Sequence, residues 1–223
     1  MVAQRLSIVV PALNEARGIR AALEALAPLR ARGHEVILAD GGSADGTPEL
    51  AAGLCDRVVR APRGRASQMN AGAAVASGEA LLFLHADTRL PQRADELIFQ
   101  SLRFSRWGRF DVEILARHPL LKVVAWAMNL RSRLTGIATG DQAIFVRRDA
   151  FPGFPEIALM EDVAFSKAMK RRAPPACRRE KVRTSGRRWE TRGVLRTIVL
   201  MWRLRLLYFL GARPEHLARI YYR

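Results

Sequence analysis

Two short polar segments each follow an apolar run and contain residue types that bind nucleotides or metal ions. The segment Asp40-Gly41-Gly42-Ser43-Ala44-Asp45-Gly46-Thr47 places two carboxylates beside glycines, and glycines let the backbone approach a ligand closely. It lacks the Gly-Lys-Ser/Thr of a Walker A loop and the Gly-x-Gly-x-x-Gly dinucleotide fingerprint. A carboxylate at a strand end can accept a hydrogen bond from a base N–H or a ribose hydroxyl. The alternative is an ordinary glycine-rich turn capped by Asp45.

The segment Leu84-His85-Ala86-Asp87-Thr88 ends a run too apolar to lie at the surface. Because burial of a lone carboxylate is costly, Asp87 either reaches solvent as a strand-end cap or holds a cation. A hard divalent cation there would bridge diphosphate oxygens. His85 is either a further ligand or a packed, hydrogen-bonded histidine.

Glu161-Asp162 opens a predicted helix. A carboxylate can act as a general base in catalysis. Acidic residues are also common at helix starts because they interact favourably with the helix dipole.

The first 90 or so residues alternate between strand and helix patterns, and this alternation predicts a mainly parallel sheet with helices on both faces. In such sheets ligands bind beyond the carboxyl ends of the strands, where Asn14-Glu15, the segment from Asp40 to Thr47, and Asp87 all fall. Four strands are predicted: Leu6–Val10, Glu35–Asp40, Arg57–Arg60 and Ala80–His85, and Pro11 ends the first of them. Helices are predicted to start at Asn14-Glu15, at Thr47 and at Ser67, with Thr47 as a cap and Pro48 in the first helical position.

The second half is less regular. It predicts an aromatic and basic loop over Arg106–Asp111, a strand over Ala143–Val146, and helices over Glu161–Arg172 and Gly193–Gly211. We expect a single α/β domain, with a nucleotide-binding half (1–90), an acceptor and catalytic half (91–190) and a C-terminal helical segment (191–223).

The 223 residues carry a formal net charge of +16, and such a field attracts nucleic acid, an anionic bilayer or phosphorylated small molecules. The two cysteines lie far apart without metal-ligand spacing and suggest reduced thiols in a cytoplasmic protein. There is no signal-peptide pattern at the start of the sequence. The longest apolar stretch, near residues 194–210, contains three arginines and is too charged for a spanning helix.

That stretch predicts an amphipathic C-terminal helix on which Leu195, Ile198 or Val199, Trp202 and Leu206 line one face. The helix either packs on the domain or lies on the inner face of the cytoplasmic membrane, near a lipid-linked acceptor.

Taken together, the blocks resemble family 2 glycosyltransferases, which are inverting enzymes of the GT-A fold. The resemblance rests on Val10–Glu15, Asp40–Thr47, Arg63–Gly72 and Leu84–Thr88, in this order, and covers residues 6 to about 190. The His85-Ala86-Asp87-Thr88 version is most similar to a small bacterial subgroup.

The resemblance implies roles for individual residues. The resemblance implies a nucleotide-sugar donor, most often a UDP-sugar in this family. Its base and ribose would be surrounded by Pro11, Asn14, Glu15, Asp40, Gly41 and Asp45, and Arg65 and Gln68 would lie by its ribose or diphosphate. Asp87 would bind Mn²⁺ or Mg²⁺, with His85 in place of the usual first aspartate. Asp162 would be the general base and Glu161 its helper. Gly140, Asp141, Gln142, Arg187, Arg188 and Trp189 would line the sugar, diphosphate or acceptor pocket.

Two other functions are compatible with parts of the sequence. One is a basic protein that binds nucleic acid or membrane on a non-catalytic fold of this kind, although the Lys and Arg residues are dispersed and no nucleic-acid module is visible. The other is a sugar-nucleotide nucleotidyltransferase, which usually carries a glycine-rich basic loop where Pro11–Glu15 stands.

Overall fold

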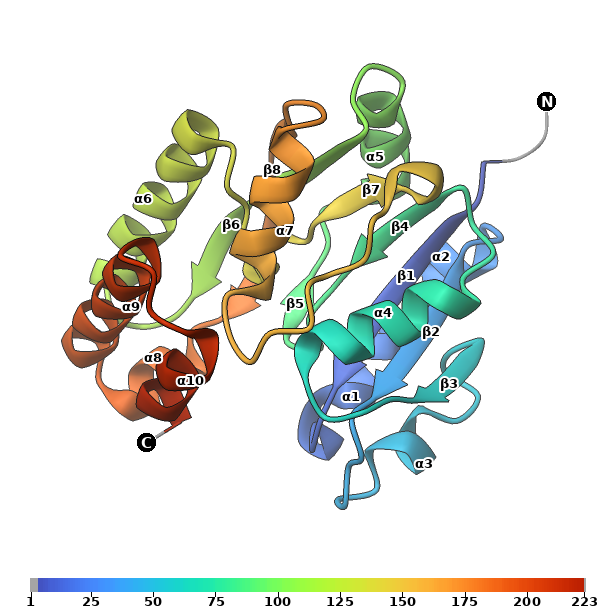
Figure 1. The fold of residues 1–223 in the computed structure, drawn as a ribbon. Helices are drawn as coiled ribbons and strands as arrows, with labels where there is room; N and C mark the ends of the chain where they lie inside the picture. The colour runs from blue at the N-terminus through green and yellow to red at the C-terminus, as the bar shows by residue number, and fades with distance from the viewer. Residues whose placement is uncertain (1–3, 223) are drawn as a thin grey trace.

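The computed structural model describes residues 4–222 and shows strands and helices in alternation through the first half (Figure 1). The elements of this half are β1 (Leu6–Ala12), α1 (Ala16–Glu24), α2 (Ala27–Ala31), β2 (Glu35–Asp40), α3 (Thr47–Ala51), β3 (Arg57–Arg60), α4 (Arg65–Val75), β4 (Ala80–Phe83), β5 (Thr88–Arg89) and α5 (Ala94–Leu102). The predicted strands Glu35–Asp40 and Arg57–Arg60 are confirmed with the same bounds.

The second half continues the same sheet. Its elements are β6 (Trp107–Leu115), α6 (Leu120–Thr135), β7 (Phe145–Arg147), α7 (Glu161–Lys170), β8 (Ala176–Ser185), α8 (Arg187–Arg192), α9 (Val194–Phe209) and α10 (Pro214–Tyr222), with short 3₁₀ turns at Gly140–Gln142 and Arg148–Ala150. The strand order is β3-β2-β1-β4-β7-β6-β8-β5. The first four strands in this order pair in parallel, whereas β7 is antiparallel to both its neighbours and β5 is antiparallel to β8.

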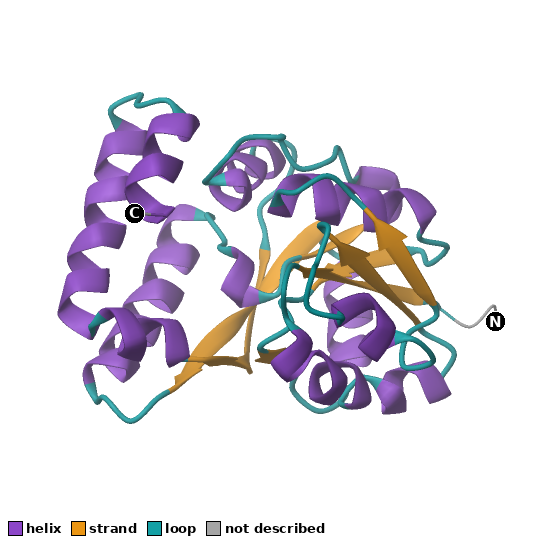
Figure 2. Ribbon diagram, turned by 90° about the horizontal axis from the view of Figure 1, so that it is seen from below, coloured by secondary structure: helices purple, strands orange, loops and turns teal. Residues whose placement is uncertain are grey.

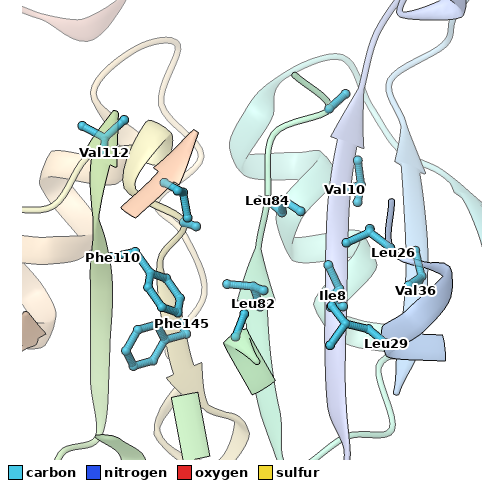
Figure 3. Close-up of a cluster of buried hydrophobic side chains, with 14 of the residues drawn as sticks. Ile8, Val10, Leu26, Leu29, Val36, Leu82, Leu84, Phe110, Val112 and Phe145 are labelled. Carbon is cyan, nitrogen blue, oxygen red and sulfur yellow. The ribbon is translucent and has the colours of Figure 1, made fainter. Parts of the chain in front are cut away.

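Side chains of successive strand residues point to opposite faces, and each face has its own apolar core. On one face Ile8, Val10 and Leu82 pack with residues of α1, α2, α5 and α6, and Phe110 and Phe145 extend this cluster across the sheet (Figure 3). On the other face Val9 and Phe83 pack with residues of α4 and α7. The predicted α/β fold with helices on both faces is therefore confirmed; the division into three functional segments stays a prediction.

Several local predictions were wrong: the strand predicted over Ala80–His85 ends at Phe83, and the strand predicted over Ala143–Val146 is Phe145–Arg147. β1 continues through Pro11, which pairs with Ala39; β4 leaves β1 after Val9, so the missing proline N–H is tolerated on a strand paired on one side. Thr47 is the first residue of α3 rather than its cap, which is Gly46 with φ of 82°.

The segment Arg106–Asp111, predicted as a loop, is mostly strand β6, which lies between β7 and β8. It looked irregular because it contains charges, yet Arg109 is 0% exposed. Its guanidinium pairs with Asp111, which also bonds Arg133 at 2.6 Å. A buried strand tolerates these charges because they neutralise one another.

Helix α6 and the C-terminal helices gather at the end of the molecule away from the N terminus (Figures 1 and 2). The predicted C-terminal helix is confirmed as α9, but it buries Val194, Thr197 and Leu204, whereas the predicted apolar face of Leu195, Val199, Trp202 and Leu206 is exposed. No helix within residues 4–222 is long and apolar enough to cross a bilayer.

Candidate active site at the carboxyl ends of the strands

The loops after β1 and β2 are tied to each other by side-chain to backbone hydrogen bonds. Asn14, with φ of 55°, accepts from the Ala44 N–H at 3.0 Å, and its own N–H donates to Ser43 Oγ at 2.9 Å. Asp45 accepts from the Ala16 N–H at 3.0 Å and from the hydroxyl of Thr47 at 2.5 Å. The Thr47 hydroxyl in turn accepts from the N–H of Glu15 at 2.9 Å.

These contacts decide what Asp45 does. Hydrogen bonds, the strongest from Thr47, hold the pKa of this exposed carboxyl below its ordinary value. Both its oxygens serve the ends of two helices, so the alternative of a capped glycine-rich turn fits Asp45 better than the predicted place in the nucleotide pocket.

Asp40 lies at the end of β2 and is 2% exposed. Its Oδ2 accepts from the N–H groups of Gly42 and Ser43, both at 3.0 Å. Its Oδ1 is buried and has no hydrogen-bond partner in the described part of the chain. An unsatisfied buried acceptor is uncommon and costs free energy, so this oxygen is suited to a donor group of a ligand.

Gln68, predicted to contact the donor, has a different role in the structure. Its amide nitrogen donates to the carbonyl oxygens of Ala12 at 2.5 Å and Ala39 at 3.1 Å, joining the ends of β1 and β2. The side chain lies under Gly41, where a Cβ atom would come within 2.8 Å of that nitrogen. Gln68 therefore positions the two strand ends, and Gly41 must be glycine to cover it.

Arg65 at the start of α4 faces Glu161 at the start of α7, with 3.7 Å between Nη1 and Oε1. Burial by itself would lower the pKa of Arg65, but the charges of Glu161, Tyr221 and Asp141 together raise that pKa. Burial and the charge of Asp162 raise the pKa of Glu161, and Arg65 opposes the rise. This contact joins the predicted donor side to the predicted catalytic pair.

The carboxylate of Asp162 is held by the backbone. Its Oδ2 accepts from the Gly140 N–H at 2.9 Å and its Oδ1 from the Val163 N–H at 2.7 Å. The ring of His85 lies against Gly140, where a Cβ would approach it to 2.7 Å, and His85 Nδ1 is 3.4 Å from Asp141 Oδ1. The residues after β4, the turn that precedes β7 and the start of α7 are thus in direct contact.

Asp87 is exposed at the tip of this strand, and its Oδ1 has only long contacts with the hydroxyls of Thr88 (3.3 Å) and Thr184 (3.4 Å). Within residues 4–222 no three His, Cys, Asp or Glu side chains converge so as to hold a metal ion by themselves. Asp141 approaches His85 of the same motif, and a divalent cation held by Asp87 would take its other ligands from a diphosphate. The proximity of Asp141 to the metal motif was not predicted.

Three predicted pocket residues lie elsewhere. Gln142 is fully buried and bonds Thr139 and Asn129, so it builds the turn instead of lining a pocket. Trp189 in α8 packs against the apolar core, and Arg187 is exposed. The side chain of Arg188 lies outside the described residues. A hollow of about 440 Å³ near Glu79 and Asp149 is at the opposite edge of the sheet and contains none of the predicted residues.

The comparisons with known proteins agree with this arrangement. Residues 7–106 match the family model Glycosyl transferase family 2. PGL/p-HBAD biosynthesis glycosyltransferases of Mycobacterium bovis and Mycobacterium tuberculosis are 36% identical over 97 residues, a match that spans 40% of this chain and only 38% of theirs.

Two solved structures show the likeness of the fold. S. aureus TarS (residues 1–349) in complex with UDP-GlcNAc gives a TM-score of 0.65 at 18% identity, covering 82% of this chain and 58% of that one. Glucosyl-3-phosphoglycerate synthase from Mycobacterium tuberculosis, in complex with Mn²⁺, UDP and glucosyl-3-phosphoglycerate, gives 0.58 at 18% identity, covering 81% and 71%. Residues 7–106 thus match the Glycosyl transferase family 2 model, and the fold is similar to those of TarS and the synthase.

Proposed function

We propose that the protein transfers a sugar from a nucleoside-diphosphate-sugar, in the first place a UDP-sugar, to an acceptor hydroxyl. The transfer inverts the configuration at C1 of the sugar. The observation that carries this proposal is the chain of contacts that joins Arg65 to Glu161, Asp162 to Gly140, and His85 to Asp141 at the edge where the parallel strands end. This chain of contacts brings the loops proposed to bind the nucleotide close to Asp162, a carboxylate that can take a proton. The His85-Ala86-Asp87-Thr88 motif places the protein, in this proposal, in a small bacterial subgroup.

In this mechanism the buried Oδ1 of Asp40 accepts a hydrogen bond from the base or ribose of the donor. Asp162 removes the proton of the acceptor hydroxyl as its oxygen bonds to C1 of the sugar and the nucleoside diphosphate leaves. Asp87, with His85 or Asp141, would hold Mn²⁺ or Mg²⁺, as the Mn²⁺ and UDP complexes of the synthase suggest. Such a cation, when bound, neutralises charge on the departing diphosphate.

Thermal unfolding against UDP-, GDP- and dTDP-sugars, each with Mn²⁺, Mg²⁺ or EDTA, tests the donor site. A donor present at 100 times its Kd adds about 2.7 kcal/mol to the free energy of unfolding. We expect this gain with a UDP-sugar and a divalent metal, and its loss in EDTA. No shift with any combination, together with salt-dependent binding to DNA or RNA, would favour a basic binding protein instead.

Asp87→Ala tests the metal ligand. It should remove the metal-dependent part of the stabilisation by the donor while leaving the unfolding midpoint of the free protein nearly unchanged, because the side chain is exposed. Glu113→Gln, an exposed carboxylate on β6, is the matched control. A metal dependence that persists unchanged in Asp87→Ala would show that the ion binds elsewhere.

We also propose peripheral contact with an anionic bilayer on the cytoplasmic side, next to a lipid-linked acceptor. On α9 the exposed side chains repeat at helical spacing: Leu195, Val199, Trp202, Leu206 and Phe209. Val123, Trp126, Leu130 and Leu134 of α6 are exposed in the same way. Neither helix contains Asp or Glu, and each carries three basic residues. Apolar side chains among basic ones match the boundary between lipid headgroups and acyl chains, whereas a second positively charged copy would be repelled.

Co-sedimentation with vesicles of phosphatidylcholine alone or mixed with phosphatidylglycerol checks this contact. Binding should require the anionic lipid, and Trp126→Glu with Trp202→Glu should weaken it by about tenfold or more, since both apolar area and charge attraction are lost. Phe104→Glu, at an exposed site just after α5, is the control. Equal binding by the double variant, or self-association without lipid, would contradict the proposal.

A further inference from the structure

Arg131 of α6 carries hydrogen-bond donors that no group of the described chain satisfies. Its Nε and Nη2 are buried and have no hydrogen-bond partner within residues 4–222. Buried guanidinium groups are normally paired, because an uncompensated buried charge is strongly destabilising. Arg109, which is 0% exposed, follows that rule with Asp111 as its partner, and the half-buried Arg65 pairs with Glu161.

A second cation, Arg205 of α9, approaches Arg131 from the C-terminal helices. It follows the fully buried Leu204 and lies one turn before Tyr208, on the side of α9 that faces the domain. Burial and the charge of Arg205 lower the pKa of Arg131 to about 10. Burial also lowers the pKa of Arg205. Two cations close enough to interact repel each other unless an anion lies with them.

The carboxylates that interact with this pair are Asp162 and, for Arg205, Asp141. Both cations interact electrostatically with Asp162, but the two oxygens of Asp162 accept from the N–H groups of Gly140 and Val163. Asp111 is shared by Arg109 and Arg133. Helices α6 and α9 contain no acidic residue of their own.

We propose that Arg131 and Arg205 form an anion subsite that binds a phosphate or diphosphate group of the acceptor beside Asp162. This inference rests on the proposed function, because Asp162 as general base defines the acceptor side. Guanidinium groups suit the role, since their planar array of donors matches phosphate oxygens. The subsite would place the acceptor hydroxyl near Asp162 and restrict transfer to phosphorylated acceptors.

Calorimetric titration of the protein, with and without saturating UDP and Mn²⁺, tests the subsite with chosen probes. Farnesyl phosphate represents a lipid acceptor and glycerol 3-phosphate a small one; farnesol and glycerol are their neutral counterparts. Both phosphorylated probes contain the phosphate that the subsite would bind. The probe with the lower Kd shows whether the acceptor is a lipid phosphate or a small phosphorylated molecule. We expect binding of at least one phosphate, none of the neutral probes, and a loss of about tenfold or more in Arg131→Met with Arg205→Met. Arg203→Met, exposed on the same helix, should bind as the unchanged protein does.

A second measurement guards against misfolding. Because Arg131 is an unpaired buried cation, Arg131→Met should unfold at the same temperature as the unchanged protein or at a higher one. Loss of phosphate binding without loss of stability supports the subsite. Equal phosphate binding by the double variant overturns it, as does a weakened affinity for UDP, which would assign the cations to the donor. If the unchanged protein fails to bind any nucleotide-sugar, the proposed function fails, and the titration without UDP still decides the subsite.

Discussion

Asp162→Asn is expected to lower kcat for sugar transfer by about 10²–10⁴-fold, the usual contribution of a general base. An amide cannot take the proton of the acceptor hydroxyl. Its oxygen can still accept one of the two backbone hydrogen bonds that hold the carboxylate, from Gly140 or from Val163, so the turn and the start of α7 should keep their places. Donor affinity should therefore change little.

The measurement pairs turnover of the donor with the thermal shift that the donor produces. Transfer is followed with an identified acceptor, or through slow hydrolysis of the donor in its absence. Glu113→Gln should behave like the unchanged protein, because that carboxylate is exposed on β6. A variant that loses donor binding while keeping kcat at saturating donor would assign Asp162 to the nucleotide rather than to the acceptor.

Asp111→Asn should lower the free energy of unfolding by about 3–5 kcal/mol, because it leaves Arg109 as an uncompensated charge in the sheet. Arg109 is 0% exposed and Asp111 is its ion-pair partner. The amide keeps the shape of the carboxylate, so the change isolates the charge. Urea denaturation followed by circular dichroism provides the number.

Two companion variants make this prediction specific. Glu113→Gln removes an exposed ion pair with Arg183 on the same strand and should change stability by no more than about 1 kcal/mol. Arg109→Met with Asp111→Leu removes both buried charges and should recover much of the loss. If Asp111→Asn is as mild as Glu113→Gln, the buried pair contributes nothing to the fold.

Local sequence patterns were sufficient to predict an element where its environment is the same along its whole length. The run Glu35-Val36-Ile37-Leu38-Ala39-Asp40 predicts β2 with its observed bounds, because the whole strand is covered on both faces. The same reasoning placed the polar clusters at the carboxyl ends of parallel strands. Their order and spacing indicated a resemblance to family 2 glycosyltransferases, and residues 7–106 match that family model.

Local patterns failed where a residue's partner is distant in the chain. Arg109 and Asp111 looked like loop residues because their mutual neutralisation, shared with Arg133 of α6, appears only when the strand and helix pack. Gln68 resembled a ligand contact, yet its amide is used by carbonyl groups 56 and 29 residues away. A polar residue's type indicates what it can bond, and only packing decides which partner it meets.

The sequence by itself determined the sheet class, the end of the sheet where the polar clusters gather, and the residue types available there, since hydrophobic periodicity and turn residues act over short distances. The tertiary structure alone decided which of these side chains remain available to a ligand. It left Asp40 Oδ1 without a partner, used Asp45 and Gln142 to hold turns, and brought Arg131 and Arg205 to Asp162 from helices with no visible motif. The physical reason is that burial and pairing are set by contacts across the whole chain, and these contacts determine the free energy of every charged group.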